Sequence, residues 1–169
     1  MQSNARAWRG YGAALAAYFL IPWADTSYAA STTSTFAVQV AITATCTINS
    51  ASTLNFGTQG VLGTNVDQTS TLQVTCTNTT PYNIGLDAGT GSGATVATRK
   101  LTSGGATVNY TLYSDSGRTT VWGTTIATDT VAGTGNGAAQ SYTVYGRIPT
   151  QTTPAPGNYA DTITVTVTY

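Results

Sequence analysis

The sequence predicts an all-β fold, an antiparallel β-sandwich. Apolar and polar residues alternate along many segments, and the side chains of a strand alternate between its two faces. Clusters of Gly, Pro, Asn and Asp separate these segments, and such clusters favour turns. After residue 30, no window of about eleven residues has the 3.6-residue period of an amphipathic helix.

The first element is a predicted secretory signal peptide, residues 1–29. Arg6 and Arg9 precede the apolar stretch Tyr11–Ala24, and small residues lead to a cleavage site at Ala29. The alternative is an uncleaved membrane anchor. This stretch is shorter than the roughly 20 residues that a spanning helix needs, and a proline interrupts it. We therefore expect a secreted chain without a membrane anchor after cleavage.

The second element is the longest alternating segment, Phe36–Ile48. At about 3.3 Å per residue a strand of this length would reach roughly 43 Å. A compact domain of about 140 residues is only about 37 Å wide. We therefore expect the first part of this strand to pair outside its own domain. One face carries Phe36, Val38, Val40, Ile42, Ala44, Cys46 and Ile48.

The remaining strands are predicted from shorter alternating segments, whose spacing is typical of a sandwich. Their aligned residues are, in order, Leu72, Val74 and Cys76; Tyr82, Ile84 and Leu86; Val108, Tyr110 and Leu112; Tyr142, Val144, Gly146 and Ile148; and Tyr159, Asp161, Ile163, Val165, Val167 and Tyr169. Weaker strand candidates lie at Thr53–Phe56, Ala94–Leu101 and Thr119–Trp122.

The two cysteines, Cys46 and Cys76, both follow the predicted signal peptide. Export leads to an oxidising compartment, so we expect one structural disulfide, worth roughly 3–4 kcal/mol on the chain-entropy model. The alternatives are a metal pair and a catalytic thiol. Both lack a histidine partner, because the sequence contains no His.

Composition argues against catalysis, cofactors and nucleic-acid binding. The chain has no His, and its six acidic residues are all Asp, so the usual general bases are scarce. Six Lys and Arg balance them, without the basic cluster that phosphate binding needs. The glycine-rich segment Leu86–Ala94 lacks the lysine of a phosphate-binding loop, and Ala88 stands where an Asp-Thr-Gly protease motif needs Thr. We interpret it as a hairpin loop, and expect no enzyme, cofactor or metal site.

Three sequence blocks, together with the cysteines, resemble the spore coat protein U domain family, which includes the subunits of archaic chaperone–usher pili. The resemblance covers about Ala37–Tyr169. The blocks are "TLNFGT" (Thr53–Thr58), "YTLYSDSGRTTVWG" (Tyr110–Gly123) and "YTVYGRIPTQTTPAPGNYADTITVTVTY" (Tyr142–Tyr169), joined by "RKL" (Arg99–Leu101).

The resemblance implies an incomplete immunoglobulin-like sandwich that lacks its last strand, residues 43–169, preceded by an N-terminal donor strand segment, residues 30–42. A periplasmic chaperone would first fill the open groove with a strand. Later the N-terminal segment of the next subunit would replace it, and an outer-membrane usher would be a further partner. The donor residues would be Phe36, Val38, Val40 and Ile42, and the terminal strand at the groove would carry Ile163, Val165, Val167 and Tyr169.

The implied function is a structural pilus subunit. It would cross the periplasm and polymerise head-to-tail with other copies or related pilins by donor-strand exchange, forming a cell-surface filament for adhesion and biofilm. One alternative is a spore or cell-surface coat protein of the same fold. Another is a secreted sugar-binding β-sandwich, in which Trp122 or exposed tyrosines stack on the ligand.

Overall fold

The computed structural model describes residues 27–169, so most of the predicted signal peptide lies outside the described residues. The chain divides into two units, one ending at Gln39 and the other spanning Val40–Tyr169. In the first unit, residues 27–39 belong to no helix or strand. No helix capable of spanning a membrane occurs in the described part. The proposed divisions at 30–42 and 43–169 stay predictions.

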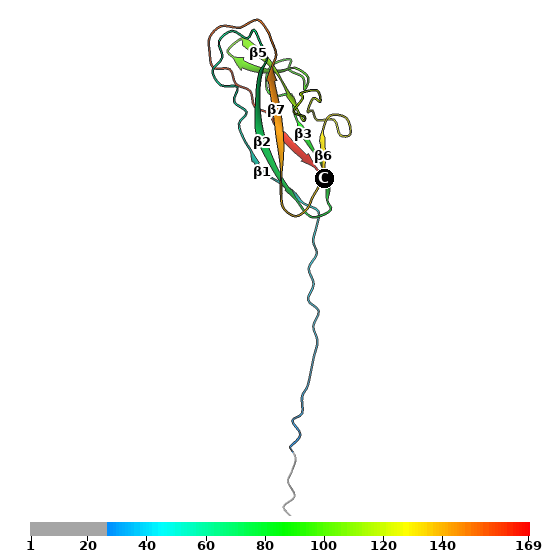
Figure 1. Cartoon of the computed structure of the whole chain (residues 1–169). Coiled ribbons are helices and arrows are strands. Elements are labelled where there is room, and N and C mark those ends of the chain that lie inside the picture. Colours follow the sequence, from blue (N-terminus) through cyan, green and yellow to red (C-terminus); the bar gives the residue numbers. More distant parts are fainter. Residues whose placement is uncertain (1–26) are drawn as a thin grey trace, which may run out of the picture. The chain divides into compact units, whose positions relative to one another are not determined.

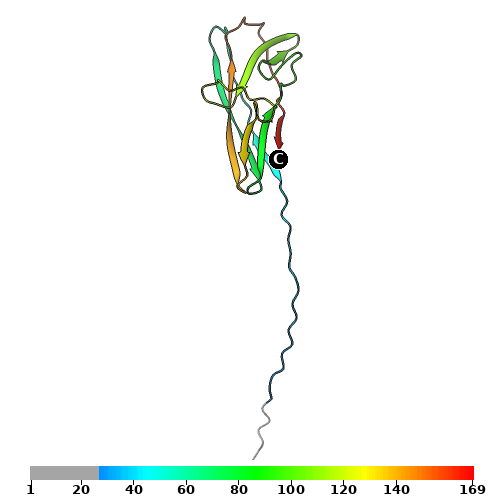
Figure 2. The ribbon, with the colours of Figure 1, turned by 90° about the vertical axis from the view of Figure 1, so that its right-hand side faces the viewer.

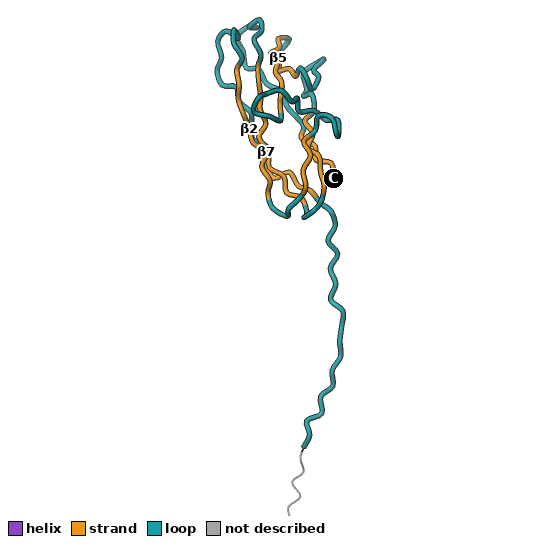
Figure 3. Tube along the Cα trace, turned by 45° about the vertical axis from the view of Figure 1, so that its right-hand side comes forward, coloured by secondary structure: helices purple, strands orange, loops and turns teal. Residues whose placement is uncertain are grey.

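The second unit is built from eight antiparallel strands in two sheets, with no helix among the described residues (Figures 1 and 3). One sheet has the order β1-β2-β7-β5-β4 and the other β6-β3-β8. The predicted all-β sandwich is confirmed. The strands are β1 (Cys46–Ala51), β2 (Val66–Cys76), β3 (Pro81–Leu86), β4 (Arg99–Ser103), β5 (Ala106–Tyr113), β6 (Val131–Thr134), β7 (Ala139–Ile148) and β8 (Val165–Thr168).

The core lies between the two sheets and follows the two-residue alternation of the sequence. Inward positions of β2, β3, β5 and β7 are buried, while residues between them are more exposed. Burial of these apolar side chains is the main favourable contribution to folding. The core residues on these strands are Leu72, Val74, Cys76, Tyr82, Ile84, Leu86, Val108, Tyr110, Leu112, Val144 and Ile148.

The prediction of one continuous strand over Phe36–Ile48 is wrong, because the first strand, β1, begins only at Cys46. Cys46 lies opposite Cys76, the last residue of β2, and their disulfide is formed. The ladder stops where β2 ends, although Thr45 and Thr43 still bond to Thr77, the residue after Cys76. Ile48, expected to face inward, is 39% exposed.

The final predicted strand is also shorter than expected. Only Val165–Thr168 pairs with β3 (Figure 2), while Ala160 forms an isolated bridge with Thr102. Among the weaker candidates, Thr53–Phe56 is not a strand, and Ala94–Leu101 becomes β4 at Arg99–Ser103.

Two further local assignments differ from the sequence pattern. Thr119–Trp122 contributes only a bridge between Tyr113 and Val121. The short strand β6 was not expected, since four residues with a central glycine carry little alternation. Both depend on which other strand offers a partner, β5 for Val121 and β3 for β6.

Arg99 is the largest departure from the usual rule that charged residues stay exposed. Its side chain is fully buried, and burial lowers its pKa. The guanidinium donates hydrogen bonds to the backbone carbonyls of Asp87 at 2.8 Å, Val96 at 2.7 Å, Leu86 at 2.9 Å and Trp122 at 2.7 Å. It therefore ties the end of β3 to the segment after β5.

An exposed ion pair on the β2–β7 ladder predicts a pH dependence. Arg147 donates to both carboxylate oxygens of Asp67, at 2.7 and 2.8 Å. This hydrogen bonding, helped by the nearby Arg118, holds the pKa of Asp67 below its ordinary value. A depressed carboxylate pKa stabilises the fold above the unfolded-state pKa of about 3.9 and loses that contribution as the pH falls through the folded-state value.

We expect the free energy of unfolding of the wild type to fall below about pH 4 more steeply than that of Asp67→Asn. Urea denaturation from pH 2.5 to 7 measures both curves. Parallel curves over this range would contradict the assignment.

Candidate functional site

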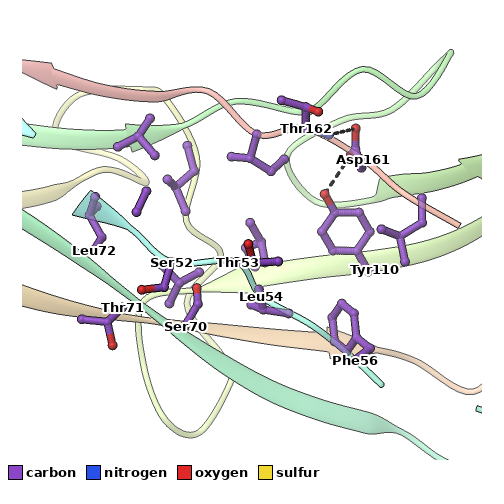
Figure 4. A pocket seen from close by; sticks show the side chains of 17 residues that line it. Ser52, Thr53, Leu54, Phe56, Ser70, Thr71, Leu72, Tyr110, Asp161 and Thr162 are labelled. Carbon is purple, nitrogen blue, oxygen red and sulfur yellow. Dashed lines mark hydrogen bonds between the residues drawn. The ribbon is translucent and has the colours of Figure 1, made fainter. Parts of the chain in front are cut away.

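An open groove lies where the two sheets fail to close on each other. β1 is an edge strand that pairs with β2, and β8 is an edge strand that pairs with β3. The groove, of about 390 Å³, runs between the segment after β1 and the segment before β8 (Figure 4). Its lining residues are Ala51–Leu54, Phe56, Ser70–Leu72, Leu86, Leu101, Tyr110, Leu112, Val144, Asp161–Ile163 and Val165.

The floor of the groove is the hydrophobic core itself. Leu72, Leu86, Leu112 and Val144 line the groove and also belong to the buried core cluster. An edge strand beside exposed core presents unpaired N–H and C=O groups together with apolar surface. The groove therefore offers what an added strand needs, backbone partners at its edges and apolar sites between them.

Of the four terminal-strand residues predicted for the groove, two line it. Ile163 and Val165 are lining residues, and Val167 packs against the core from the next inward position of β8. All three are only partly buried. Tyr169 is 58% exposed and does not line the groove.

The groove continues past Asp161 into a second cavity of about 840 Å³. This cavity lies between the loop Thr53–Leu62 and the segment Thr153–Asp161. The two cavities share Thr53, Leu54, Phe56, Leu101 and Asp161. An extended occupant of the first cavity therefore has space to continue into the second.

Asp161 holds the β8 side of the groove in place. Its carboxylate accepts hydrogen bonds from the Tyr110 hydroxyl at 2.8 Å, from the Thr90 amide at 2.8 Å and hydroxyl at 2.9 Å, and from the Thr162 amide at 2.8 Å. Burial and the Asp161 hydrogen bond raise the pKa of Tyr110, so Tyr110 stays a hydrogen-bond donor. A Cβ at Gly89 would overlap the carboxylate.

Sequence reasoning missed this network. The available signal was an aspartate at an inward position of an otherwise apolar alternating segment, which predicts a specific polar partner. The partner Thr90 lies in the glycine-rich loop, far away along the chain. A second carboxylate, Asp87, accepts from the Thr164 amide at 2.9 Å. Together they hold Asp161–Thr164 in place without a strand ladder.

The four predicted donor residues are exposed apolar side chains. In the first unit, Phe36 and Val38 are 87% and 84% exposed. In the second unit, Val40 and Ile42 are 85% and 76% exposed. None of the four belongs to a strand. Isolated exposed apolar residues are common, but the strict alternation of these four along the sequence is the pattern of a strand with one apolar face.

Within residues 27–169, no group of three His, Cys, Asp or Glu side chains is placed to hold a metal ion. Trp122, the candidate stacking residue of the sugar-binding alternative, is 1% exposed and donates its indole N–H to Ile84 O at 2.8 Å. Its ring is therefore part of the core.

Comparison with known proteins is consistent with this architecture. The family model described as Spore Coat Protein U domain matches residues 32–166. "Protein U" of Myxococcus xanthus is 33% identical over 139 residues, which cover 73% of this chain and 77% of that protein.

One similar solved structure is the crystal structure of the CsuC–CsuE chaperone–tip adhesion subunit pre-assembly complex from archaic chaperone–usher Csu pili of Acinetobacter baumannii. The TM-score is 0.54 at 25% sequence identity, over 76% of this chain. The match spans 40% of the length of the other chain.

Proposed function

The chain belongs to the Spore Coat Protein U domain family, and from this premise we propose that it is a pilus subunit polymerised by donor-strand exchange. Such a protein is structural and non-enzymatic. The observation that carries the proposal is the pairing of two features in one chain. One is a groove that lacks a strand, and the other is an exposed segment with the alternation of a strand.

The two features match in chemistry. Burying Phe36, Val38, Val40 and Ile42 contributes roughly 1.5–3 kcal/mol each, or about 6–12 kcal/mol as an upper estimate. The backbone of the segment would pair with the free edge of β8 and cover the core floor. Strand addition of this kind removes the aggregation hazard of an open edge.

The geometry of the contact favours a filament. Donor segment and acceptor groove are different surfaces of the same chain, so a contact between two copies is heterologous and leaves a free groove and a free segment at the two ends. Further copies or related pilins then extend the chain head-to-tail.

The partners follow from the same groove. Before polymerisation, a strand from a periplasmic chaperone would cover it, and the similar structure of a chaperone–subunit complex supports a chaperone as partner. An outer-membrane usher would then bring subunits together. The route is export by the signal peptide, transit through the periplasm and display on the cell surface, where the filament serves adhesion and biofilm formation.

Deleting residues 30–42 tests the donor assignment. We expect a folded subunit that still binds a chaperone but forms no filaments, because the groove remains and the segment that fills it is gone. Electron microscopy of cells that express the variant in place of the wild type measures filament formation. Filaments built from the truncated chain alone would show that the donor lies elsewhere.

A matched pair of substitutions separates strand donation from general effects of the segment. Val40→Asp places a charge on the apolar face and is expected to block assembly, since burying an unpaired carboxylate in the groove is costly. Ala41→Asp places the same charge on the opposite face and is expected to assemble. Equal assembly of both variants would contradict insertion of this face.

The second candidate function is a spore or cell-surface coat protein of the same fold, favoured by the description of the family as Spore Coat Protein U domain. Such a protein would pack on a surface without filaments. Electron microscopy of the producing cells distinguishes a layer from fibres.

A further inference from the structure

The chain just before β1 is held by one residue, Thr77, through its amide and its hydroxyl. The Thr77 amide donates to Thr45 O at 2.9 Å, and its hydroxyl oxygen accepts from the Thr45 amide at 2.7 Å. The same oxygen lies 3.0 Å from Thr45 O and 3.3 Å from Thr43 O, either of which can take its proton. Pairing therefore extends one residue before Cys46, through one backbone bond and one hydroxyl that takes the place of a backbone carbonyl.

Thr77 begins a turn after β2 that hydrogen bonds to the loop around Gly135 hold in place. The Thr79 amide donates to Gly135 O, and the Gly135 amide donates to Thr80 O, both at 2.8 Å. A Cβ at Gly135 would overlap the Thr77 carbonyl, so the close approach requires glycine there. The disulfide adjoins the turn at Cys76. The position of the Thr77 hydroxyl is therefore fixed by its own turn, by the loop around Gly135 and by the adjacent disulfide.

From this arrangement we propose that Thr77 is a positioning residue that sets the angle between consecutive subunits. The inference rests on the proposed strand donation by Phe36–Ile42. Three residues, Thr43–Thr45, then connect the donated segment to Cys46, a span of at most roughly 10 Å.

Thr77 immobilises most of this connection. With both backbone groups of Thr45 bonded and Thr43 O within reach of the same hydroxyl, Ala44 keeps most of the remaining freedom. A short connection with one end fixed allows few orientations of the next subunit. The filament is therefore expected to be stiff at this joint.

The test is Thr77→Val, which keeps the β-branched shape and removes the hydroxyl. Thr75→Val is the matched control, because Thr75 lies two residues earlier, on β2, and its hydroxyl also reaches across to β1, donating to Asn49 Oδ1 at 2.8 Å. In the unpolymerised subunit we expect the Thr45 amide to exchange about tenfold faster in Thr77→Val, as loss of one hydrogen bond predicts. The control leaves this rate unchanged.

In assembled filaments, Thr77→Val is expected to shorten the persistence length by about twofold or more and to broaden the angle between subunits, measured by electron microscopy. These readouts distinguish positioning from stability, since melting temperature alone does not report an angle. Thr77→Ser keeps the hydroxyl and is expected to restore wild-type exchange and bending. If the valine variant fails to fold, Thr77→Ser still tests whether the hydroxyl alone is enough for wild-type exchange and bending.

The outcomes separate this inference from the proposed function. If filaments of the Thr77→Val variant bend as wild-type filaments do, the role of Thr77 is overturned and strand donation is left intact. An unchanged exchange rate at Thr45 would also overturn it. A wild-type chain that forms no filaments under any chaperoned condition would overturn strand donation itself, and the positioning role with it.

Discussion

Appending a second copy of residues 34–44 after Tyr169 through a short Gly/Ser linker is expected to yield a monomer that melts at a higher temperature. β8 ends at Thr168, so a hairpin loop of a few residues can return the added segment along the free edge of β8. The groove floor would then be covered within one chain. The tether replaces the entropy cost of association with a smaller cost of loop closure.

The expected rise in melting temperature is the difference between two opposing free-energy terms. Burial of the four apolar side chains favours insertion by about 6–12 kcal/mol as an upper estimate, while ordering the backbone and side chains of the added segment opposes it. We expect a net gain of about 2–3 kcal/mol, which raises the Tm of a domain this size by roughly 5–12 °C. Differential scanning calorimetry on the purified monomer measures it.

The matched control carries the same appended segment with aspartate at the positions that copy Val38 and Val40. Linker, length and outward face are unchanged, and only the apolar face is lost. We expect this control to melt with the wild type. A rise of equal size in both proteins would mean that the tail stabilises by some route other than filling the groove.

Replacing Arg99 by methionine is expected to lower the free energy of unfolding by about 3–5 kcal/mol. Methionine fills similar volume, yet it leaves the carbonyls of Asp87, Val96, Leu86 and Trp122 without the guanidinium that satisfies them. A buried acceptor without a partner costs about 1–3 kcal/mol, and water entering the end of the sandwich would offset part of the sum. Urea denaturation followed by tryptophan fluorescence reports the change, since Trp122 is one of the residues released.

Two companion variants test whether geometry or charge explains the loss. Arg99→Lys keeps a cation but cannot span four separated acceptors, so we expect an intermediate destabilisation. Arg147→Met removes an arginine from the partly exposed pair with Asp67, for which we expect less than about 1 kcal/mol. Similar losses for Arg99→Met and Arg147→Met would contradict a structural role specific to Arg99.

The alternation of the sequence predicted one wall of the groove but not the other. Ile163 and Val165 lie at the groove because alternation placed them on the inward face of the last segment. Ala51–Leu54, which form the opposite wall, have no comparable pattern. They line the groove because β1 is the edge of its sheet, a property that depends on strand order.

Three features follow from the amino-acid sequence alone, namely the all-β class, the buried face of each main strand and the two cysteines available for bonding. Those features depend on residues one or two positions apart, or on residue type alone, and the two-residue period of a strand is readable along the chain. Leu72, Val74, Ile84 and Leu112 are buried as that period predicts.

Three other features depend on the packing of the whole domain, namely where strand pairing stops, which charged side chain is buried and which sheet edges stay open. The alternation of Phe36–Ile48 is continuous, but β2 has no residue beyond Cys76 for the earlier part to pair with. Arg99 and Asp161 take their roles from carbonyls, a tyrosine and a threonine contributed by other elements. A hydrogen bond needs two partners, and the second one is placed by the fold of the whole domain.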